Sequence, residues 1–422
     1  MKTNRLARLS TWFAMALMNI LAASTCHDNF LNAAEPPVKR DIALTAAQRL
    51  MSNNNNDFAC NLFRAISKQK HDDRSTIVSP ISVSYMLGML NDGADGETYL
   101  QISNVLGMGG SIEEMNKYFK KMIDEAPRVD TRVTVKIANS INVNSAQGIS
   151  LVPQYEDDML KYYKAQVDAL DFTNSESLHR INNWCKDNTY GLIPKILDKL
   201  EASAAMYLLN AVYLKASWTK KFDSNATRDL NFTKQDGSTV TRKMMHLKTR
   251  VSYGEDNLCK MLCMPYGSGG YSMYVLLPKE RHTIDEIIQS LTAQKLKQIK
   301  RHTTASHEVD ILMPRFTTTC ETNLKDVLSS MGMPRVFDRN SAQFPYMANG
   351  HGDLYVSMMK QKAKIEVDEE GTKAAAVTVT EMRNRSVSIS SGYTFHATHP
   401  FVYYIVEGST GSIFFMGTYC GD

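Results

Sequence analysis

The chain has 422 residues and 43% of them are apolar, so it can bury one large core or the cores of two ordinary domains. The formal net charge of only +4 gives no indication of a nucleic-acid partner. Seven cysteines are present, but their spacings form neither a dense disulfide framework nor a CxxC or His/Cys cluster. The sequence therefore predicts no bound metal and no cofactor.

The N-terminus has the pattern of a cleaved export signal. Basic residues precede a short apolar stretch over 12–23, and small residues follow it. The apolar run is too short to cross a membrane comfortably, and Asn19 interrupts it. The sequence predicts a signal peptide over residues 1–25 and a flexible leader over residues 26–47, which contains Pro36-Pro37.

Cys26 leaves two alternatives for the localisation of the protein. Residues 23–26 resemble a bacterial lipobox, although Ala23 stands where leucine is usual. In the first alternative, Cys26 is lipidated after cleavage, and the protein is a periplasmic or outer-membrane lipoprotein that meets the membrane only through this N-terminal lipid. In the second, ordinary cleavage near Ser24 leaves Cys26 without a role, and the protein is extracellular. Both alternatives predict an exported protein.

The first predicted helix follows the leader. Phe58, Leu62 and Ile66 are spaced by four and define one apolar helical face. Ser52 and the run of four asparagines after it are polar cap candidates that precede this face. The sequence therefore predicts a helix that begins after the asparagine run.

Helices dominate early in the chain and strands dominate late. Ser79-Pro80 predicts the start of a second helix, because serine suits an N-cap and proline suits the first turn. Segments rich in Val, Ile, Tyr and Phe at strand length lie over 260–265, 271–277, 309–316, 363–368 and 401–417. This order, without regular alternation, predicts a single α+β domain over residues 48–422 and not a doubly wound parallel sheet.

Motifs of common enzyme classes are absent from the sequence. The chain lacks a GxSxG elbow, an HExxH helix, a phosphate-binding P-loop and a GxGxxG turn after a strand. His396 and His399 flank the start of a predicted strand, and we assign them a structural role. These absences weaken the case for an enzyme.

The segment over residues 365–386 has an informative alternation. A strand pattern ends at an acidic pair, and Gly371, small residues and β-branched residues follow. Every charge after Gly371 lies at an odd position, such as Lys373 and Glu381, whereas the even positions of 372–384 are small and uncharged. The segment can therefore enter a sheet in one register only, since a slip by one residue would bury the charges. The alternative is a routine hairpin strand followed by a polar loop.

This segment and other motifs in the chain resemble the serpin family of protease inhibitors. Each motif is weak alone, but their order is specific, and the resemblance covers residues 50–420 nearly without gaps. The further motifs are Ser79 to Ser82, Asn91 to Thr98, Ile181 to Trp184, Asn210 to Trp218, Met264 to Tyr266, Pro314 to Phe316, Leu328 to Met333, Phe395 to Ile405 and Ile413 to Gly417. The resemblance implies a monomer in which helices pack on a large central mixed β-sheet with two smaller sheets. It also implies an exposed reactive-centre loop, here at about 369–392.

The resemblance implies a suicide inhibitor and not an enzyme. A target protease cleaves the exposed loop and forms a covalent acyl-enzyme, and the freed strand then inserts into the central sheet. The insertion drags the protease to the far pole and distorts its active site before deacylation. The implied partner is therefore the target protease, held in a covalent complex.

The family's hinge and reactive bond can be carried over residue by residue. The hinge positions are Glu369, Gly371, Thr372, Ala374, Ala375, Ala376 and Val377. Lys373 departs from the acidic residue that is often found there, but it lies on the solvent face. The family spacing from the hinge glycine places the reactive bond at Arg385-Ser386. Arg383 and Met382 are alternative cleavage sites, because the stretch that follows is longer than in familiar members.

Other carried-over positions concern the opening of the sheet. Ser79, Ser82 and Asn210 match a polar cluster beneath the sheet where strands part, and Gln361 stands where many members have a histidine. In the same way, Trp218 and Glu369 match the sheet opening where the loop begins. Ordinary core packing or capping is the alternative to a gating role for each of them.

An arginine before the reactive bond predicts trypsin-like serine proteases as targets, because an acidic specificity pocket would bind it in a charge-assisted bidentate contact. Some papain-like cysteine proteases are included in this prediction. The first alternative is a non-inhibitory serpin that acts as a carrier or chaperone, although such members usually have bulky, charged or proline residues in the hinge. The second is an unrelated secreted hydrolase.

Overall fold

The structure is a computed structural model that describes residues 38–69, 74–349, 354–372 and 392–422. The predicted signal peptide and Cys26 lie outside the described residues. Val38–Asp422 form one unit, which is described here by itself.

Strands occur along the whole of this unit. In chain order they are β1 (Thr76–Val78), β2 (Val133–Asn144), β3 (Ser150–Leu151), β4 (Gln166–Leu170), β5 (Met206–Ser217), β6 (Arg228–Thr233), β7 (Thr239–Glu255), β8 (Cys259–Tyr266), β9 (Tyr271–Pro278), β10 (Ser306–Pro314), β11 (Phe316–Asn323), β12 (Ala348–Asn349), β13 (Val356–Val367), β14 (Gly371–Thr372), β15 (Tyr393–His396), β16 (Phe401–Glu407) and β17 (Ile413–Tyr419).

Helices lie mostly in the first half of the chain. The α-helices are α2 (Ala46–Gln69), α3 (Pro80–Gly93), α4 (Gly96–Leu106), α5 (Ile112–Glu125), α6 (Pro153–Asp158), α7 (Ser175–Asn188), α8 (Ile284–Ser290), α9 (Ala293–His302) and α10 (Leu324–Ser330). Shorter turns are η1 (Ala126–Arg128), η2 (Ser145–Gln147), η3 (Met159–Tyr163), η4 (Ser224–Ala226) and η5 (Pro334–Phe337). In the part of the chain that the structure describes, no helix has the length and apolar character needed to span a membrane.

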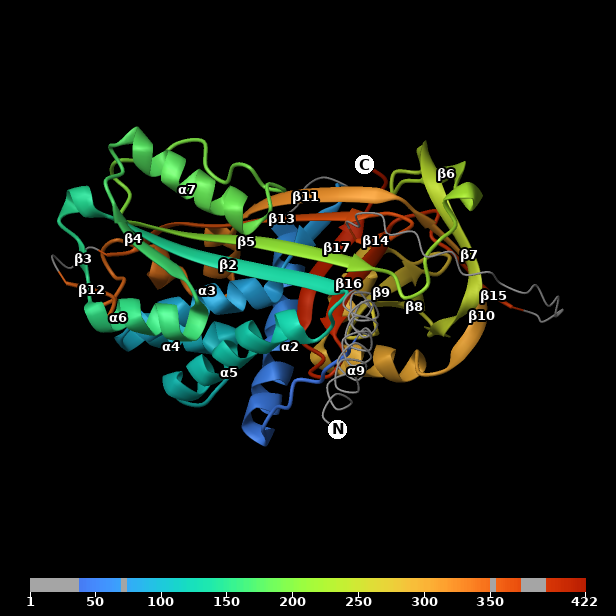
Figure 1. The fold of residues 1–422 in the computed structure, drawn as a ribbon, viewed down its shortest axis with the longest axis horizontal. Coiled ribbons are helices and arrows are strands. Elements are labelled where there is room, and N and C mark those ends of the chain that lie inside the picture. The colour runs from blue at the N-terminus through green and yellow to red at the C-terminus, as the bar shows by residue number, and fades with distance from the viewer. Residues whose placement is uncertain (1–37, 70–73, 350–353, 373–391) are drawn as a thin grey trace, which may run out of the picture. The chain divides into compact units, whose positions relative to one another are not determined.

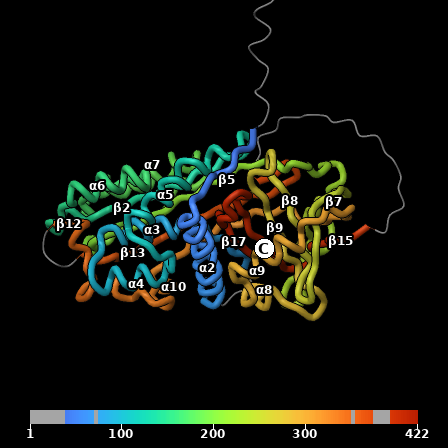
Figure 2. Tube along the Cα trace, turned by 90° about the horizontal axis from the view of Figure 1, so that it is seen from below, coloured from blue at the N-terminus to red at the C-terminus, as the bar shows by residue number. Residues whose placement is uncertain are grey.

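Two large sheets organise the unit. One has six strands in the order β11-β13-β14-β5-β2-β4, and the other has nine, in the order β1-β17-β16-β9-β8-β7-β10-β15 with β6 paired to β7. The third sheet is the short pair β12-β3. Figure 1 shows the six-stranded sheet between α7 on one face and α2, α3, α4 and α5 on the other. In Figure 2, α8 and α9 lie beside the nine-stranded sheet, away from α4 and α10. The predicted α+β class is confirmed, although the sheet with six strands is accompanied by a larger one with nine, where two smaller sheets were expected.

The fold begins earlier in the chain than the sequence predicted. The side chains of Ile42 and Leu44 are buried, and the Ile42 amide donates to Ser409 Oγ at 2.9 Å. These two apolar residues contact the core, so the predicted leader of 26–47 is folded onto the body over its last part.

The first helix also contains the residues that were expected to precede it. It begins at Ala46, and Ser52 and two of the asparagines are buried inside it. Asn56 Nδ2 donates to the Gly411 carbonyl at 2.9 Å, and Ser52 Oγ donates to the Thr410 carbonyl at 3.3 Å. The cap prediction is therefore wrong, because these polar side chains are satisfied by a distant turn that local sequence does not reveal.

Two predicted strand segments are divided in the structure. Arg315 separates β10 from β11, which belong to different sheets, within the predicted 309–316 segment. The predicted 401–417 segment is the hairpin of β16 and β17. Cys60, Cys185, Cys259 and Cys263 are free thiols, and burial raises the pKa of Cys60, Cys185 and Cys259 to about 12.

Candidate functional site: the sheet opening before the loop

The six-stranded sheet has an opening at one end of β13 and β5. These strands pair in parallel from Val356 and Met206 as far as Ala363 and Val212. Beyond that point, β14 lies between them and pairs antiparallel with both (Figure 1). The chain therefore leaves β13, turns back, and re-enters its own sheet as the start of a new central strand.

A tight turn at Asp368 reverses the chain between β13 and β14. The Asp368 carboxylate accepts from the amides of Glu370 at 2.9 Å and Gly371 at 3.1 Å. The backbone amide of Asp368 donates to the carbonyl of Gly371 at 2.9 Å. This turn fixes the register in which the hinge enters the sheet.

Gly371 is required at the re-entry point. Its φ of +149° belongs to a region that L residues rarely adopt, and a Cβ atom there would lie 2.0 Å from the Ala216 carbonyl oxygen. The backbone of β14 can approach β5 this closely only because this position has no side chain.

Thr372 is held in the sheet by a buried aromatic pair. The side chain is 1% exposed, and its hydroxyl lies 2.7 Å from the Tyr266 hydroxyl. Tyr266 stacks on Trp218 with ring centroids 4.3 Å apart, and Trp218 Nε1 donates to the Asp368 carbonyl at 3.0 Å. Burial raises the pKa of Tyr266, which keeps the phenol protonated and able to donate. Thr372 thus lies on the even-numbered face that the alternation predicted to be buried.

Glu369 anchors the turn through a buried carboxylate. Arg315 Nη2 lies 2.7 Å from both carboxylate oxygens, and the Thr227 hydroxyl donates to Oε1 at 2.6 Å. Burial alone would raise the pKa of Glu369, but the hydrogen bonds from Arg315 and Thr227 outweigh it and lower this pKa. The neighbouring Glu370 makes a more exposed ion pair with Lys221 at 2.5 Å.

Glu369→Gln is expected to destabilise this turn. The variant keeps the size of the side chain but loses the charge that Arg315 and Thr227 bond, so the free energy of unfolding should fall by about 1–3 kcal/mol. The pKa of Glu369 is lowered in the folded state. Its carboxylate therefore stabilises the fold at pH values above its ordinary pKa near 4, and this stabilisation is lost as the pH falls through the pKa of the folded state.

The measurement is urea unfolding of the variant and the parent at neutral and at acid pH, with the exposed Glu370→Gln as the control. A stability loss that is equal at both pH values would contradict the role of the Glu369 charge.

The predicted polar cluster beneath the sheet is assembled in the structure. The Ser79 amide donates to Gln361 Oε1 at 2.7 Å, and Gln361 Nε2 donates to the Ser79 carbonyl at 3.1 Å and to Asn210 Oδ1 at 3.0 Å. The Ser79 and Ser82 hydroxyls lie 2.7 Å apart. Gln361 therefore bridges β13, β5 and the start of α3, and its amide both donates and accepts at the position where many family members have a histidine. Ser79 occupies the cap position of α3, but its side chain makes no cap hydrogen bond.

Sequence reasoning missed three contributors to these sites. Asn139 of β2 accepts from Asn210 Nδ2 at 2.8 Å and extends the polar cluster across a third strand. Arg315 and Tyr266 were noted only as parts of motifs. Asn139 lies in a strand with several other polar residues, so nothing in the sequence singled it out, and the partners of Arg315 and Tyr266 depend on the fold.

The remaining predicted site residues lie outside the described residues. They are Ala374, Ala375, Ala376, Val377, Met382, Arg383, Arg385 and Ser386. Of the predicted hinge, the structure places Glu369, Gly371 and Thr372.

Comparisons with known proteins show to which family the chain belongs. A family model described as serpin (serine protease inhibitor) matches residues 53–421. The chain is 30% identical over 368 residues to antichymotrypsin-2 of Bombyx mori, which covers 86% of this chain and 96% of that protein. It is also 30% identical over 380 residues to the leukocyte elastase inhibitor of Equus caballus, and this match covers 87% of this chain and 98% of that protein.

Solved structures show the same fold. Tengpin, a thermophilic serpin in the native state, matches with a TM-score of 0.83 at 29% identity, over 91% of this chain and 98% of that chain. Thyroxine-binding globulin in complex with thyroxine matches with a TM-score of 0.78 at 27% identity, over 87% of this chain and 98% of that chain. The chain belongs to the serpin family, a family of protease inhibitors and not of enzymes.

Proposed function

We propose that the protein inhibits trypsin-like serine proteases as a suicide substrate, with Arg385-Ser386 as the cleaved bond and Arg383 or Met382 as alternatives. Some papain-like cysteine proteases fall within the same proposal. The observation that supports it best is β14, because Gly371 and Thr372 of the hinge already form a strand in the sheet that would receive the rest.

The register of β14 predicts where each later hinge residue would lie after cleavage. Thr372 is paired antiparallel with Val367 of β13 and with Ala216 of β5. Each further residue along the hinge therefore moves one position back along both strands. Even-numbered hinge residues would keep the buried face that Thr372 occupies.

Ala374 would enter a buried apolar position. By this register it would lie between Ile365 and Leu214, whose side chains are 2% and 3% exposed. A methyl group adds little volume between them, and a larger or charged side chain would have to be accommodated in a packed interior.

Ala376 would mark the point at which the sheet must open. Its predicted neighbours, Ala363 and Val212, are at present paired with each other. Insertion from here onward has to separate β13 from β5 by one further strand spacing, about 4.8 Å. The hinge can therefore begin in the sheet before cleavage, whereas the rest of the strand cannot.

Thr378 would reach the polar cluster. The same register places it between Gln361 and Asn210, so the hydrogen bond that now joins those two side chains has to break. The Thr378 hydroxyl can donate and accept, and it can replace the lost contact. The cluster would thus hold the sheet closed before cleavage and receive a polar residue after it.

The alternative is a non-inhibitory carrier. The resemblance to thyroxine-binding globulin, a serpin named for a bound ligand, is the observation that favours it. The small, uncharged even face of the hinge favours insertion, and therefore favours the inhibitor.

A cleavage experiment separates the two. Limited proteolysis within the loop is expected to raise the unfolding midpoint by roughly 10 °C or more, because a new strand of about ten residues adds hydrogen bonds of about 1 kcal/mol each. Differential scanning calorimetry of intact and cleaved protein measures this shift. An unchanged midpoint would favour the carrier.

We propose that the protein is located outside the cytoplasm after its signal peptide, residues 1–25, is removed. We also propose that it is a monomer. The mass of the mature N-terminal peptide distinguishes the two alternatives for Cys26. A mass increased by a diacylglycerol and an acyl chain is expected for the lipoprotein, and an unmodified peptide is expected for the extracellular protein.

A further inference from the structure

The first described residues and the end of α9 meet around one turn, the tip of the hairpin of β16 and β17. The Ile42 amide donates to Ser409 Oγ at 2.9 Å, and Lys300 Nζ donates to the Gly408 carbonyl at 3.4 Å. In Figure 1, α9 and the blue start of the described chain lie on one side of the molecule, and α7 lies on the opposite side. Figure 2 views the molecule from below, the side of α9. These segments therefore share one face.

This face carries an excess of positive charge. Its basic side chains are exposed, and within the described part of the chain they make no ion pair with a carboxylate. Together they are called the basic face, which consists of Arg40, Arg49, Lys297, Lys300 and Arg301. The neighbouring Lys39 adds no net charge, because it pairs with Asp41 at 3.7 Å. The helix dipole favours cations in the last turn of α9, but it does not account for the two arginines near the start of the described chain. The face as a whole favours an anionic partner.

Two exposed apolar side chains accompany these charges. Leu50, in the first turns of α2, is 60% exposed and follows Arg49, and Val38 is 38% exposed and lies two residues before Arg40. A dissolved polyanion gains nothing from an exposed leucine. A membrane surface binds both kinds of group, because its headgroups attract the charges and its interface takes up the apolar side chains. The combination therefore favours a lipid surface.

We propose that the basic face, together with Val38 and Leu50, docks on the surface of an anionic phospholipid bilayer. The arginines and lysines would lie among the headgroups, and Leu50 would enter the interface between headgroups and acyl chains. The charges and the apolar side chains would act together, because neither alone gives stable binding to a bilayer.

The chain that precedes this face is short. Residues 26–37 separate Cys26 from Val38, and they can extend over at most about 40 Å. In the lipoprotein alternative, a step that rests on the proposed localisation, an acylated Cys26 would therefore hold this face close to the membrane. Stable anchoring usually takes two signals, such as an acyl chain and a basic patch, and the basic face would supply the second.

Docking in this orientation would leave the central sheet free to open. The face of the six-stranded sheet that α7 covers points away from α9 (Figure 1). The bilayer would therefore lie on the side opposite to α7 and would not obstruct the entry of a strand between β13 and β5.

The binding test uses the full mature chain with Cys26→Ser, which cannot be acylated, and two kinds of vesicle. One kind contains only phosphatidylcholine, and the other contains one part phosphatidylglycerol to two parts phosphatidylcholine. We expect the protein to sediment with the anionic vesicles at low salt, to leave them as the salt concentration rises, and not to sediment with the neutral ones. Equal sedimentation with both kinds, or with neither, would overturn the docking surface.

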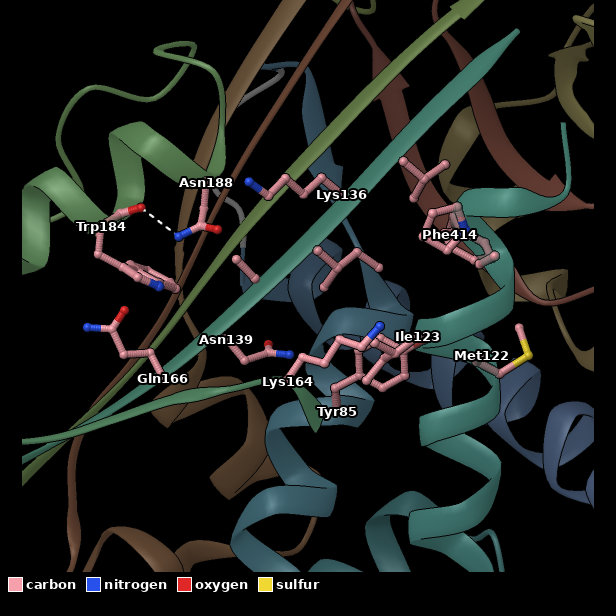
Figure 3. A pocket seen from close by; sticks show the side chains of 15 residues that line it. Tyr85, Met122, Ile123, Lys136, Asn139, Lys164, Gln166, Trp184, Asn188 and Phe414 are labelled. Atoms are coloured by element: carbon pink, nitrogen blue, oxygen red, sulfur yellow. Dashed lines mark hydrogen bonds between the residues drawn. The ribbon is translucent and has the colours of Figure 1, made fainter. Parts of the chain in front are cut away.

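A charge variant locates the face that binds. Lys297→Gln combined with Arg301→Gln should weaken binding to the anionic vesicles about twentyfold, because each basic residue near a charged membrane raises the affinity about fivefold. The matched control removes two positive charges on the opposite side, with Lys136→Gln and Lys186→Gln. Lys186 belongs to α7, and Lys136 lines a cavity with Asn188 of α7 (Figure 3). An equal loss in the two variants would show that net charge alone drives binding and would contradict docking by the basic face.

Leu50→Gln distinguishes a membrane from a dissolved polyanion. The side chain is exposed, so the variant should keep the unfolding midpoint of the parent. It should weaken binding to the anionic vesicles about fivefold and leave retention on dextran sulfate unchanged. Vesicle binding that is unaffected by Leu50→Gln would assign the face to polyanions and overturn the membrane proposal. These measurements involve no protease, so their failure cannot be confused with a failure of the proposed inhibition.

Discussion

Ala376→Arg is expected to convert the protein from an inhibitor into a substrate. The register set by Thr372 places position 376 between Ala363 and Val212, on the buried face and at the point where the sheet has to open. Burying an unpaired guanidinium there costs about 3–5 kcal/mol, so insertion should slow by about a hundredfold or more. Hydrolysis of the acyl-enzyme then competes successfully with insertion.

The matched control is Ala375→Arg, one residue earlier. By the same register its side chain would lie on the opposite face, between the partly exposed, charged Lys364 and Tyr213, which is 6% exposed. The measurement is the number of inhibitor molecules consumed per protease molecule inactivated. A large rise for Ala376→Arg with little change for Ala375→Arg is expected. Equal effects of the two variants would contradict the one-register insertion.

Arg385→Ala is expected to abolish inhibition of trypsin. A pocket built to bind an arginine by charge-assisted contacts discriminates strongly against a side chain that cannot make them, so the association rate should fall by about a thousandfold or more. The hinge is unchanged in this variant, and insertion after any cleavage would remain fast.

Arg383→Ala is the control for the position of the cleaved bond. If Arg385 precedes the reactive bond, Arg383→Ala should retain most of the association rate with trypsin. Retained inhibition by Arg385→Ala would move the reactive bond to Arg383 or Met382, and mass spectrometry of the released C-terminal peptide would show which.

The fold class was predictable because it depends on the order of helices and strands along the chain, and of the predicted hinge the structure places Glu369, Gly371 and Thr372. The even face that begins at Thr372 follows from the strand repeat of two, and the α+β class follows from helices that precede strands. The cluster of Ser79, Asn210 and Gln361 came from the resemblance, since residues so far apart in the chain have no local signal.

The errors and omissions have a common physical cause, because each depends on a distant partner. Ser52 and Asn56 have the composition of a cap, yet they lie inside α2 because the turn near Gly411 satisfies them. Arg315 finds Glu369 only once β10, β11 and the turn after β13 are in place.

The most direct measurement is denaturing gel electrophoresis of the mature protein after mixing with trypsin at several ratios. Insertion before deacylation predicts a band that survives the detergent, at the combined mass of the protein and the protease, together with loss of trypsin activity. Cleaved inhibitor alone at every ratio, with trypsin activity retained, would contradict the suicide-substrate mechanism.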